Sequence, residues 1–254
     1  MKLVVLGSGT SVPHAQRASS AYWLETGGGS MLLDISPDAA HRMAEEGLDW
    51  PGLDAIWVSH FHLDHVGGLA PFLFGTKWAP QTANRSKPLK IFGPAGIRAW
   101  LDAIDGASNY RLLQQAFAIE IIELAGGEEF EVFPGLRART FSTPHTPESL
   151  ALRLTENEQS SLIYTSDTGY ADELADFARG ADLLLMECSF RRNKPMQTHL
   201  ELADAMRVAE LAEPKRMLLT HLYPEWDGCD LVAEAGALWA GETIAAEDGL
   251  RLEV

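Results

Sequence analysis

The feature that most constrains this chain is the segment His60-Phe61-His62-Leu63-Asp64-His65, which places four metal-binding residue types within six positions. It follows directly on an apolar run that predicts a buried strand. In an extended continuation of that strand, His60 and His62 share one face, because side chains alternate with period two. A turn then sends Asp64 and His65 to a second, adjacent centre. Imidazole and carboxylate suit catalytic zinc, and also manganese or iron.

This one cluster cannot complete two coordination spheres, so further ligands must come from elsewhere in the chain. Three more potential ligands follow predicted strands: His145, Asp167 and His221. Residues at the ends of several strands converge on one edge of a sheet, where the active sites of α/β proteins tend to lie. The order of these residues therefore predicts a metal centre assembled from distant segments.

The hydrophobic patterning predicts an α/β fold. Short strands linked by tight turns dominate the first two thirds, whereas helices and strands alternate in the last third. This order indicates two mixed sheets with helices on the outside. There is no internal repeat and no long linker, so residues 1–254 are expected to form a single domain. The predicted strands are 2–6, 21–25, 30–35, 54–58, 89–92, 117–124, 128–133, 136–141, 150–155, 161–166, 182–186 and 216–220, and the predicted helices are 37–46, 95–103, 171–179, 200–211 and 231–240.

Charge and hydropathy narrow the classes of partner. The net charge is −16, and no block of Lys or Arg exceeds the pair Arg191-Arg192. This balance disfavours a long nucleic acid as partner and is compatible with a small anion at a metal centre. No apolar run approaches the roughly 20 residues of a membrane helix. Gly7 interrupts the apolar start of the chain, which therefore predicts a first strand rather than a signal peptide and a cytoplasmic protein.

Taken together, these motifs resemble the metallo-β-lactamase superfamily, and more narrowly its ribonuclease Z-like branch of phosphodiesterases. The metal motifs are residues 60–65, Ser166-Asp167-Thr168 and Leu219-Thr220-His221, and residues 7–13 are similar to the opening of that branch. Residues 186–190 are similar to its His-Glu-Ala-Thr-Phe element, with Met186 for His and Cys188-Ser189 for Ala-Thr. The resemblance implies a four-layer αβ/βα sandwich of two mixed sheets with helices on the outer faces, and it is compatible with a homodimer.

The resemblance also implies a dinuclear site with a ligand set for each metal. One metal would be held by His60, His62 and His145, the other by Asp64, His65 and His221, and Asp167 would bridge them. A hydroxide bridging the two metals would be the nucleophile, since a divalent ion lowers the pKa of water to about 7. Zinc is the expected metal, with manganese or iron as alternatives. Two ions bring a charge of +4 against −2 from the two aspartates, so the site is locally cationic.

Three further residues have expected roles around these metals. Thr198-His199-Leu200 is similar to the His-Ser-Thr element of the branch, with Leu200 for Ser. We expect His199 to protonate the leaving oxygen and Glu187 to orient its ring. Asp64 doubles as a proton acceptor for the bridging water. Asp34 stands where a carboxylate often holds a metal-binding histidine.

Three hydrolytic activities fit these residues. The first is cleavage of a small or short phosphodiester, such as a cyclic nucleotide or cyclic phosphate. The second is endonucleolytic processing of tRNA 3′ ends, which the acidic charge disfavours. Only 21 residues, 146–166, separate His145 from Asp167, an interval that carries a long tRNA-gripping arm in many ribonuclease Z enzymes. The third is hydrolysis of a lactone or other carbonyl ester, which Glu187 and His199 disfavour. A scaffold without catalysis is disfavoured because every ligand position is filled.

Overall fold

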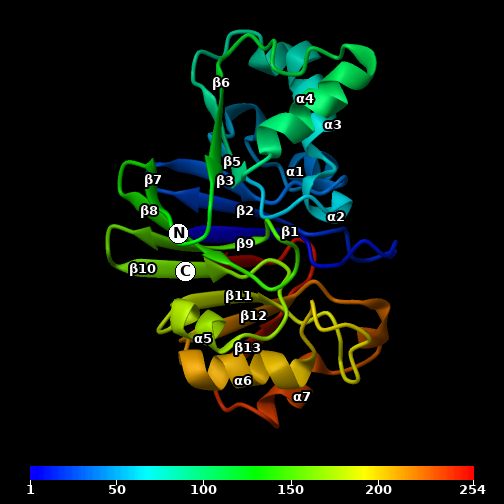
Figure 1. The fold of residues 1–254 in the computed structure, drawn as a ribbon, viewed down its shortest axis with the longest axis vertical. Coiled ribbons are helices and arrows are strands. Elements are labelled where there is room, and N and C mark those ends of the chain that lie inside the picture. The colour runs from blue at the N-terminus through cyan, green and yellow to red at the C-terminus, as the bar shows by residue number, and fades with distance from the viewer.

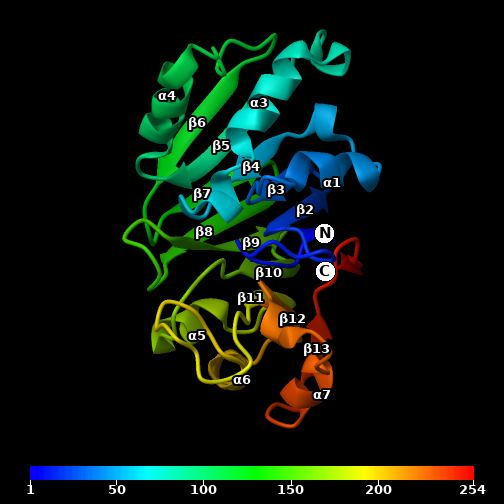
Figure 2. The same cartoon turned by 90° about the vertical axis from the view of Figure 1, so that its right-hand side faces the viewer.

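The computed structural model describes all 254 residues, and its strands form two mixed sheets of seven strands each. The strand order is β14-β1-β2-β3-β4-β5-β6 in the first sheet and β13-β12-β11-β10-β9-β8-β7 in the second. Helices α1–α4 lie beyond the first sheet and α5–α7 beyond the second, as Figures 1 and 2 show in two perpendicular views. The predicted four-layer α/β sandwich is confirmed.

The first sheet comprises β1 (Lys2–Gly7), β2 (Ala21–Thr26), β3 (Gly29–Leu33), β4 (Ala55–Trp57), β5 (Leu89–Pro94), β6 (Ile119–Leu124) and β14 (Arg251–Glu253). The second comprises β7 (Glu129–Phe133), β8 (Leu136–Ser142), β9 (Leu150–Glu156), β10 (Ser160–Tyr164), β11 (Leu183–Glu187), β12 (Arg216–Thr220) and β13 (Glu242–Ala245). The helices are α1 (Ala39–Glu45), α2 (Leu63–Val66), α3 (Leu69–Trp78), α4 (Ile97–Ser108), α5 (Asp172–Ala178), α6 (Leu202–Ala212) and α7 (Leu231–Gly236).

Four of these elements lie in segments for which the sequence predicts none: α2, α3, β13 and β14. Helix α3 contains Pro71 and Gly75, which are poor residues for a helix interior, but Pro71 falls in the first turn, where its missing N–H costs nothing. Strands β13 and β14 have four and three residues, none of them fully buried. Such short, half-exposed strands leave no periodic signal in the sequence. The predicted elements are all present; β12 has the predicted ends, and the others have one or both ends shifted.

Three apolar clusters hold the layers together. The middle cluster contains 23 buried residues from the facing sides of the two sheets, among them Trp57 of β4 and Leu185 of β11. Two outer clusters join α1, α3 and α4 to the first sheet and α5–α7 to the second. The C-terminal β14 pairs antiparallel with β1, and the two chain ends lie side by side in both views. We therefore propose that residues 1–254 form one folding unit.

Replacing Leu185 with alanine tests this packing. Leu185 is fully buried in the middle cluster, so Leu185→Ala should lower the free energy of unfolding by about 2–5 kcal/mol. Chemical denaturation should show one transition, shifted as a whole, for both sheets. The control Leu238→Ala, at a residue that is 59% exposed, should leave the midpoint nearly unchanged. Two separate transitions would contradict a single folding unit.

Candidate metal centre

The histidine-rich segment follows β4, but it does not extend that strand. β4 ends at Trp57, His60 lies in the connecting loop, and His62 is the N-cap residue of α2. The expectation that His60 and His62 share a face through strand alternation is therefore wrong. The loop brings their rings together instead, with centroids 4.7 Å apart, and the first turn of α2 carries Asp64 and His65.

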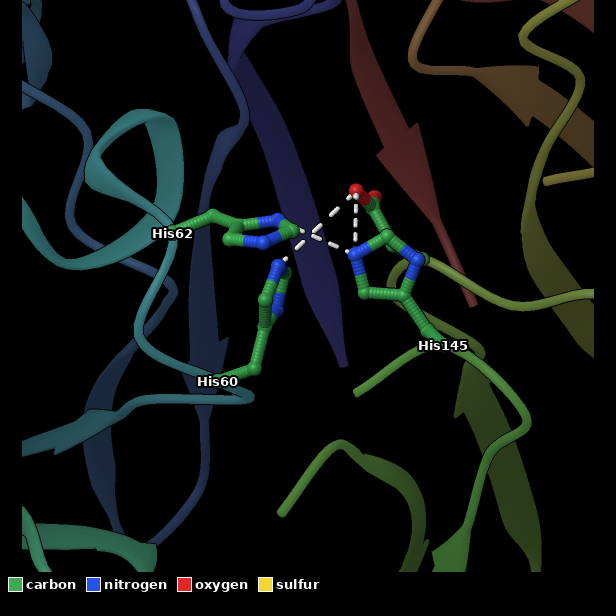
Figure 3. Close-up of side chains that lie close together, drawn as sticks. His60, His62 and His145 are labelled. Atoms are coloured by element: carbon green, nitrogen blue, oxygen red, sulfur yellow. Dashed lines mark hydrogen bonds and ion pairs between the residues drawn. The ribbon is translucent and has the colours of Figure 1, made fainter. Parts of the chain in front are cut away.

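One group of potential ligands consists of His60, His62, His145 and Asp167, whose ligand atoms all lie within 4.8 Å of one another. Nδ1 of His62 is 3.0 Å from Nε2 of His145. Oδ2 of Asp167 is 3.6 Å from Nε2 of His145 and 3.9 Å from Nε2 of His60. Figure 3 shows the three rings pointing toward one another, with His60 and His62 on one loop and His145 on another.

A second group lies on the other side of Asp167 and consists of Asp64, His65 and His221. Oδ1 of Asp167 is 3.2 Å from Nε2 of His65 and 3.3 Å from Nε2 of His221. Oδ2 of Asp64 is 3.6 Å and 3.5 Å from the same two nitrogens. The two oxygens of the Asp167 carboxylate thus face different groups of ligands.

These residues fit divalent metal ions. Nε2 of His60, His65 and His221 and Oδ1 of Asp167 are buried and have no hydrogen-bond partner. Buried polar atoms without partners are rare in folded proteins, because each costs about 1–3 kcal/mol. Metal–nitrogen bonds of about 2.0–2.1 Å in a tetrahedral site place the ligand atoms about 3.3 Å apart. The separations given above run from 3.0 to 3.9 Å, around that spacing.

The charged groups at the centre stabilise one another's ionised forms. Burial raises the pKa of the Asp167 carboxyl, but the charges of His221 and His65 outweigh burial and bring this pKa well below its usual value. Burial lowers the pKa of His65, and the charges of Asp167 and Asp34 outweigh it and raise that pKa well above 6.5. Asp167 is therefore ionised, as a metal ligand must be.

Asp34 lies at the end of β3 with a left-handed backbone (φ 57°), and it is completely buried. Its Oδ2 accepts hydrogen bonds from Nδ1 of His65 at 2.7 Å, from the Ser59 hydroxyl at 2.8 Å and from the Tyr164 hydroxyl at 2.6 Å. The carboxylate thus holds the His65 ring with Nε2 facing the metal centre, an arrangement consistent with the role expected of Asp34.

Glu187 and His199 also lie at this centre. Glu187 ends β11, and its Oε1 accepts hydrogen bonds from Nδ1 of His199 at 2.9 Å and from the backbone N–H of Thr168 at 2.7 Å. Burial lowers the pKa of His199, but the hydrogen bond and charge of Glu187 outweigh it and raise this pKa to about 9. All hydrogen bonds of the His199 ring are made through Nδ1, which leaves Nε2 available to a substrate.

The structure brings together all ten site residues expected from the sequence. It adds four hydroxyl side chains that the sequence reasoning missed: Ser59, Tyr164, Ser166 and Ser189. Ser59 directly precedes the histidine-rich segment, and Ser166 and Ser189 lie within motifs quoted above, so their positions were a usable signal. Tyr164 and Asp34 are 130 residues apart in the sequence, and no local pattern predicts such a contact.

Comparison with known proteins places this centre among metal-dependent hydrolases. A family model described as Anti-Pycsar protein Apyc1 matches residues 1–237. The chain is 28% identical to the probable metallo-hydrolase YhfI of Bacillus subtilis, over 98% of both chains. It is 26% identical to ribonuclease Z of Haloferax volcanii, over 100% of this chain and 95% of the relative. The crystal structure of YhfI superposes with a TM-score of 0.85 at 26% identity, covering 100% of this chain and 99% of that one.

These similarities confirm the predicted superfamily and the prediction of a metal-dependent hydrolase of the ribonuclease Z-like branch. Human tRNase Z, short form, shares the fold, with a TM-score of 0.81 at 21% identity over 100% of this chain and 99% of that one. No helix of the structure combines the length and apolar character needed to cross a bilayer.

Removing divalent metal should lower the thermal stability of the protein, because the metal binds only the folded centre. At a free zinc concentration of about 100 Kd, one site stabilises by about 2.7 kcal/mol, which raises Tm by roughly 5–10 °C for a chain of this size. Differential scanning calorimetry with and without a chelator measures this shift. His65→Ala should reduce the shift, whereas His41→Ala, at an exposed residue of α1, should retain it. A Tm that does not change when the chelator is added would contradict metal binding.

Proposed function

This chain belongs to the Anti-Pycsar protein Apyc1 family, and on that premise we propose that it is a dinuclear phosphodiesterase acting on small cyclic phosphates or cyclic nucleotides. The observation that carries the proposal is the position of the Asp167 carboxylate between two groups of potential metal ligands, with His199 beside it. The first group would hold one metal and the second group the other, with Asp167 shared between them.

The proposed ligands are His60, His62 and His145 for the first metal, Asp64, His65 and His221 for the second, and Asp167 for both. Zinc suits this nitrogen-rich set best, and manganese or iron also suit it. Bound divalent ions would supply Lewis acidity and a nucleophilic water near neutral pH. The residues of the chain must then place the phosphodiester, accept the proton of that water and protonate the leaving oxygen.

His199 is the proposed proton donor. Glu187 fixes the His199 ring through Nδ1, so Nε2 projects away from Glu187 and can carry the proton to the leaving oxygen. Asp64 is the proposed proton acceptor, because its carboxylate lies in the second group and is not taken up by hydrogen bonds to the backbone. A positioned general acid of this kind contributes roughly 10²–10⁴-fold to the rate.

Two observations support a small substrate over tRNA. Residues 146–166 form β9 and β10 with the short connections around them, so this interval carries no arm. The alignment with Haloferax volcanii ribonuclease Z runs over 309 positions, 55 more than the 254 residues of this chain, whereas that with YhfI runs over 259. The net charge of −16 adds to this, since phosphate contacts supply much of the affinity for RNA.

Replacing His199 should have an effect that depends on the leaving group. The leaving group of a cyclic nucleotide is a ribose alkoxide, which needs a proton. The leaving group of bis(p-nitrophenyl) phosphate is p-nitrophenolate, which is stable without one. His199→Ala should therefore lower kcat for a cyclic nucleotide by roughly 10²–10⁴-fold and kcat for bis(p-nitrophenyl) phosphate far less. Steady-state kinetics of the zinc-loaded protein measures both. His41→Ala is the control, and an equal loss on the two substrates would refute the acid role.

A direct comparison of substrates separates the candidate activities. We expect a higher kcat/KM for 3′,5′- or 2′,3′-cyclic nucleotides than for a precursor tRNA with a 3′ trailer, at the same salt and metal concentrations. The relatives named ribonuclease Z make tRNA the second candidate. Faster removal of the trailer would establish tRNA processing instead. Turnover of a lactone without turnover of any phosphodiester would point to the carbonyl hydrolase.

A further inference from the structure

We propose that Ser59 and Ser189 set the tautomers of His60 and His221, each acting as a positioning residue between a buried carboxylate and a metal-binding ring. The two serines occupy matching places in the two halves of the centre. Ser59 follows β4 of the first sheet, and Ser189 follows β11 of the second. The inference rests on the ligand roles proposed above for the two histidines.

Ser189 links Glu187 to His221. Its Oγ lies 2.5 Å from Oε2 of Glu187 and 2.9 Å from Nδ1 of His221. The carboxylate already accepts from the backbone N–H groups of Thr168 and Leu200 and from the ring of His199. A carboxylate only accepts, so the single hydroxyl proton of Ser189 goes to Glu187. The Ser189 oxygen must then accept from His221, which places the proton of His221 on Nδ1.

Ser59 repeats this arrangement in the other half. Its Oγ donates to Oδ2 of Asp34 at 2.8 Å, and it lies 3.0 Å from Nδ1 of His60. The Ser166 hydroxyl donates to Oγ of Ser59 at 2.7 Å. With its proton given to Asp34, the Ser59 oxygen can only accept from the ring. The proton of His60 is therefore also on Nδ1.

The consequence is the same for both rings. A proton on Nδ1 leaves the lone pair on Nε2, the atom that must be free to bind a metal. Nε2 of His221 is 3.3 Å from Oδ1 of Asp167, and Nε2 of His60 is 3.9 Å from Oδ2. Both nitrogens are buried without another partner. The opposite tautomer would point an N–H into each metal position and exclude the ion.

Burial makes the two hydroxyls hard to replace. Ser59 and Ser189 are each 0% exposed, so bulk solvent has no access to take over the hydrogen bonds of a missing hydroxyl. Without the hydroxyl, the ring nitrogen loses its acceptor and the carboxylate loses a donor. Partners that orient a metal-binding histidine in this way typically change metal affinity by about 10–100-fold when removed.

The test is a metal competition titration with a chromophoric chelator, made on the whole protein without substrate. Ser189→Ala should weaken one of the two metals by roughly 10–100-fold, and Ser189→Thr should restore wild-type affinity because it keeps the hydroxyl. Threonine stands at this place in the similar His-Glu-Ala-Thr-Phe element. Ser161→Ala is the matched control, since it removes a hydroxyl 3.0 Å from the Asp182 carboxylate at the start of β10, away from the histidines. This control should keep both metals.

Wild-type affinity in Ser189→Ala would overturn the proposal, and so would a loss that Ser189→Thr fails to restore. Should Ser189→Ala not fold, nitrogen NMR of the metal-free wild-type protein gives the answer directly. At a pH where the rings of His60 and His221 are neutral, both should show the proton on Nδ1, and a proton on Nε2 of the neutral ring would overturn the inference. A wild-type protein that binds no metal refutes the proposed function itself, whereas normal metal binding in Ser189→Ala refutes only this inference.

Discussion

The buried carboxylate of Asp167 is the constraint around which the centre is arranged. Its two oxygens lie within 3.9 Å of five imidazole nitrogens, those of His60, His145 and His199 near Oδ2 and those of His65 and His221 near Oδ1. An ionised carboxylate in a protein interior is expensive unless opposite charge surrounds it. The histidines supply part of that charge, and divalent ions supply the rest when bound. This requirement explains why so many polar side chains are buried at one edge of an otherwise apolar sandwich.

The centre exists only because the two sheets pack face to face. His60 and His65 follow β4 of the first sheet, whereas Asp167 and His221 follow β10 and β12 of the second. The apolar cluster between the sheets fixes the distance between these sets. Asp34 also connects the two sheets, since it follows β3 and accepts a hydrogen bond from the hydroxyl of Tyr164 in β10. The geometry of the metal site therefore depends on the same packing that stabilises the sandwich.

Much of this was accessible from the sequence, for reasons that particular residues illustrate. The ligands could be predicted because four metal-binding residue types fall within residues 60–65 and three more follow predicted strands. β11 could be predicted because an unbroken apolar run is typical of a buried strand. The conformation of residues 58–62 could not be predicted, because a loop has no periodic pattern that would show where β4 ends. Short β13 and β14 depend on pairing with strands far away in sequence, and the contact of the Tyr164 hydroxyl with Asp34 likewise spans 130 residues. Tertiary contact decides such features.

The central claim is that two metals flank Asp167, and anomalous X-ray diffraction at the zinc absorption edge tests it most directly. Crystals of zinc-loaded protein should show two strong peaks, one between Asp167 Oδ2 and the rings of His60, His62 and His145, the other between Oδ1 and the rings of His65 and His221. A single peak, or peaks only at surface carboxylates, would contradict the dinuclear centre from which the proposed chemistry follows.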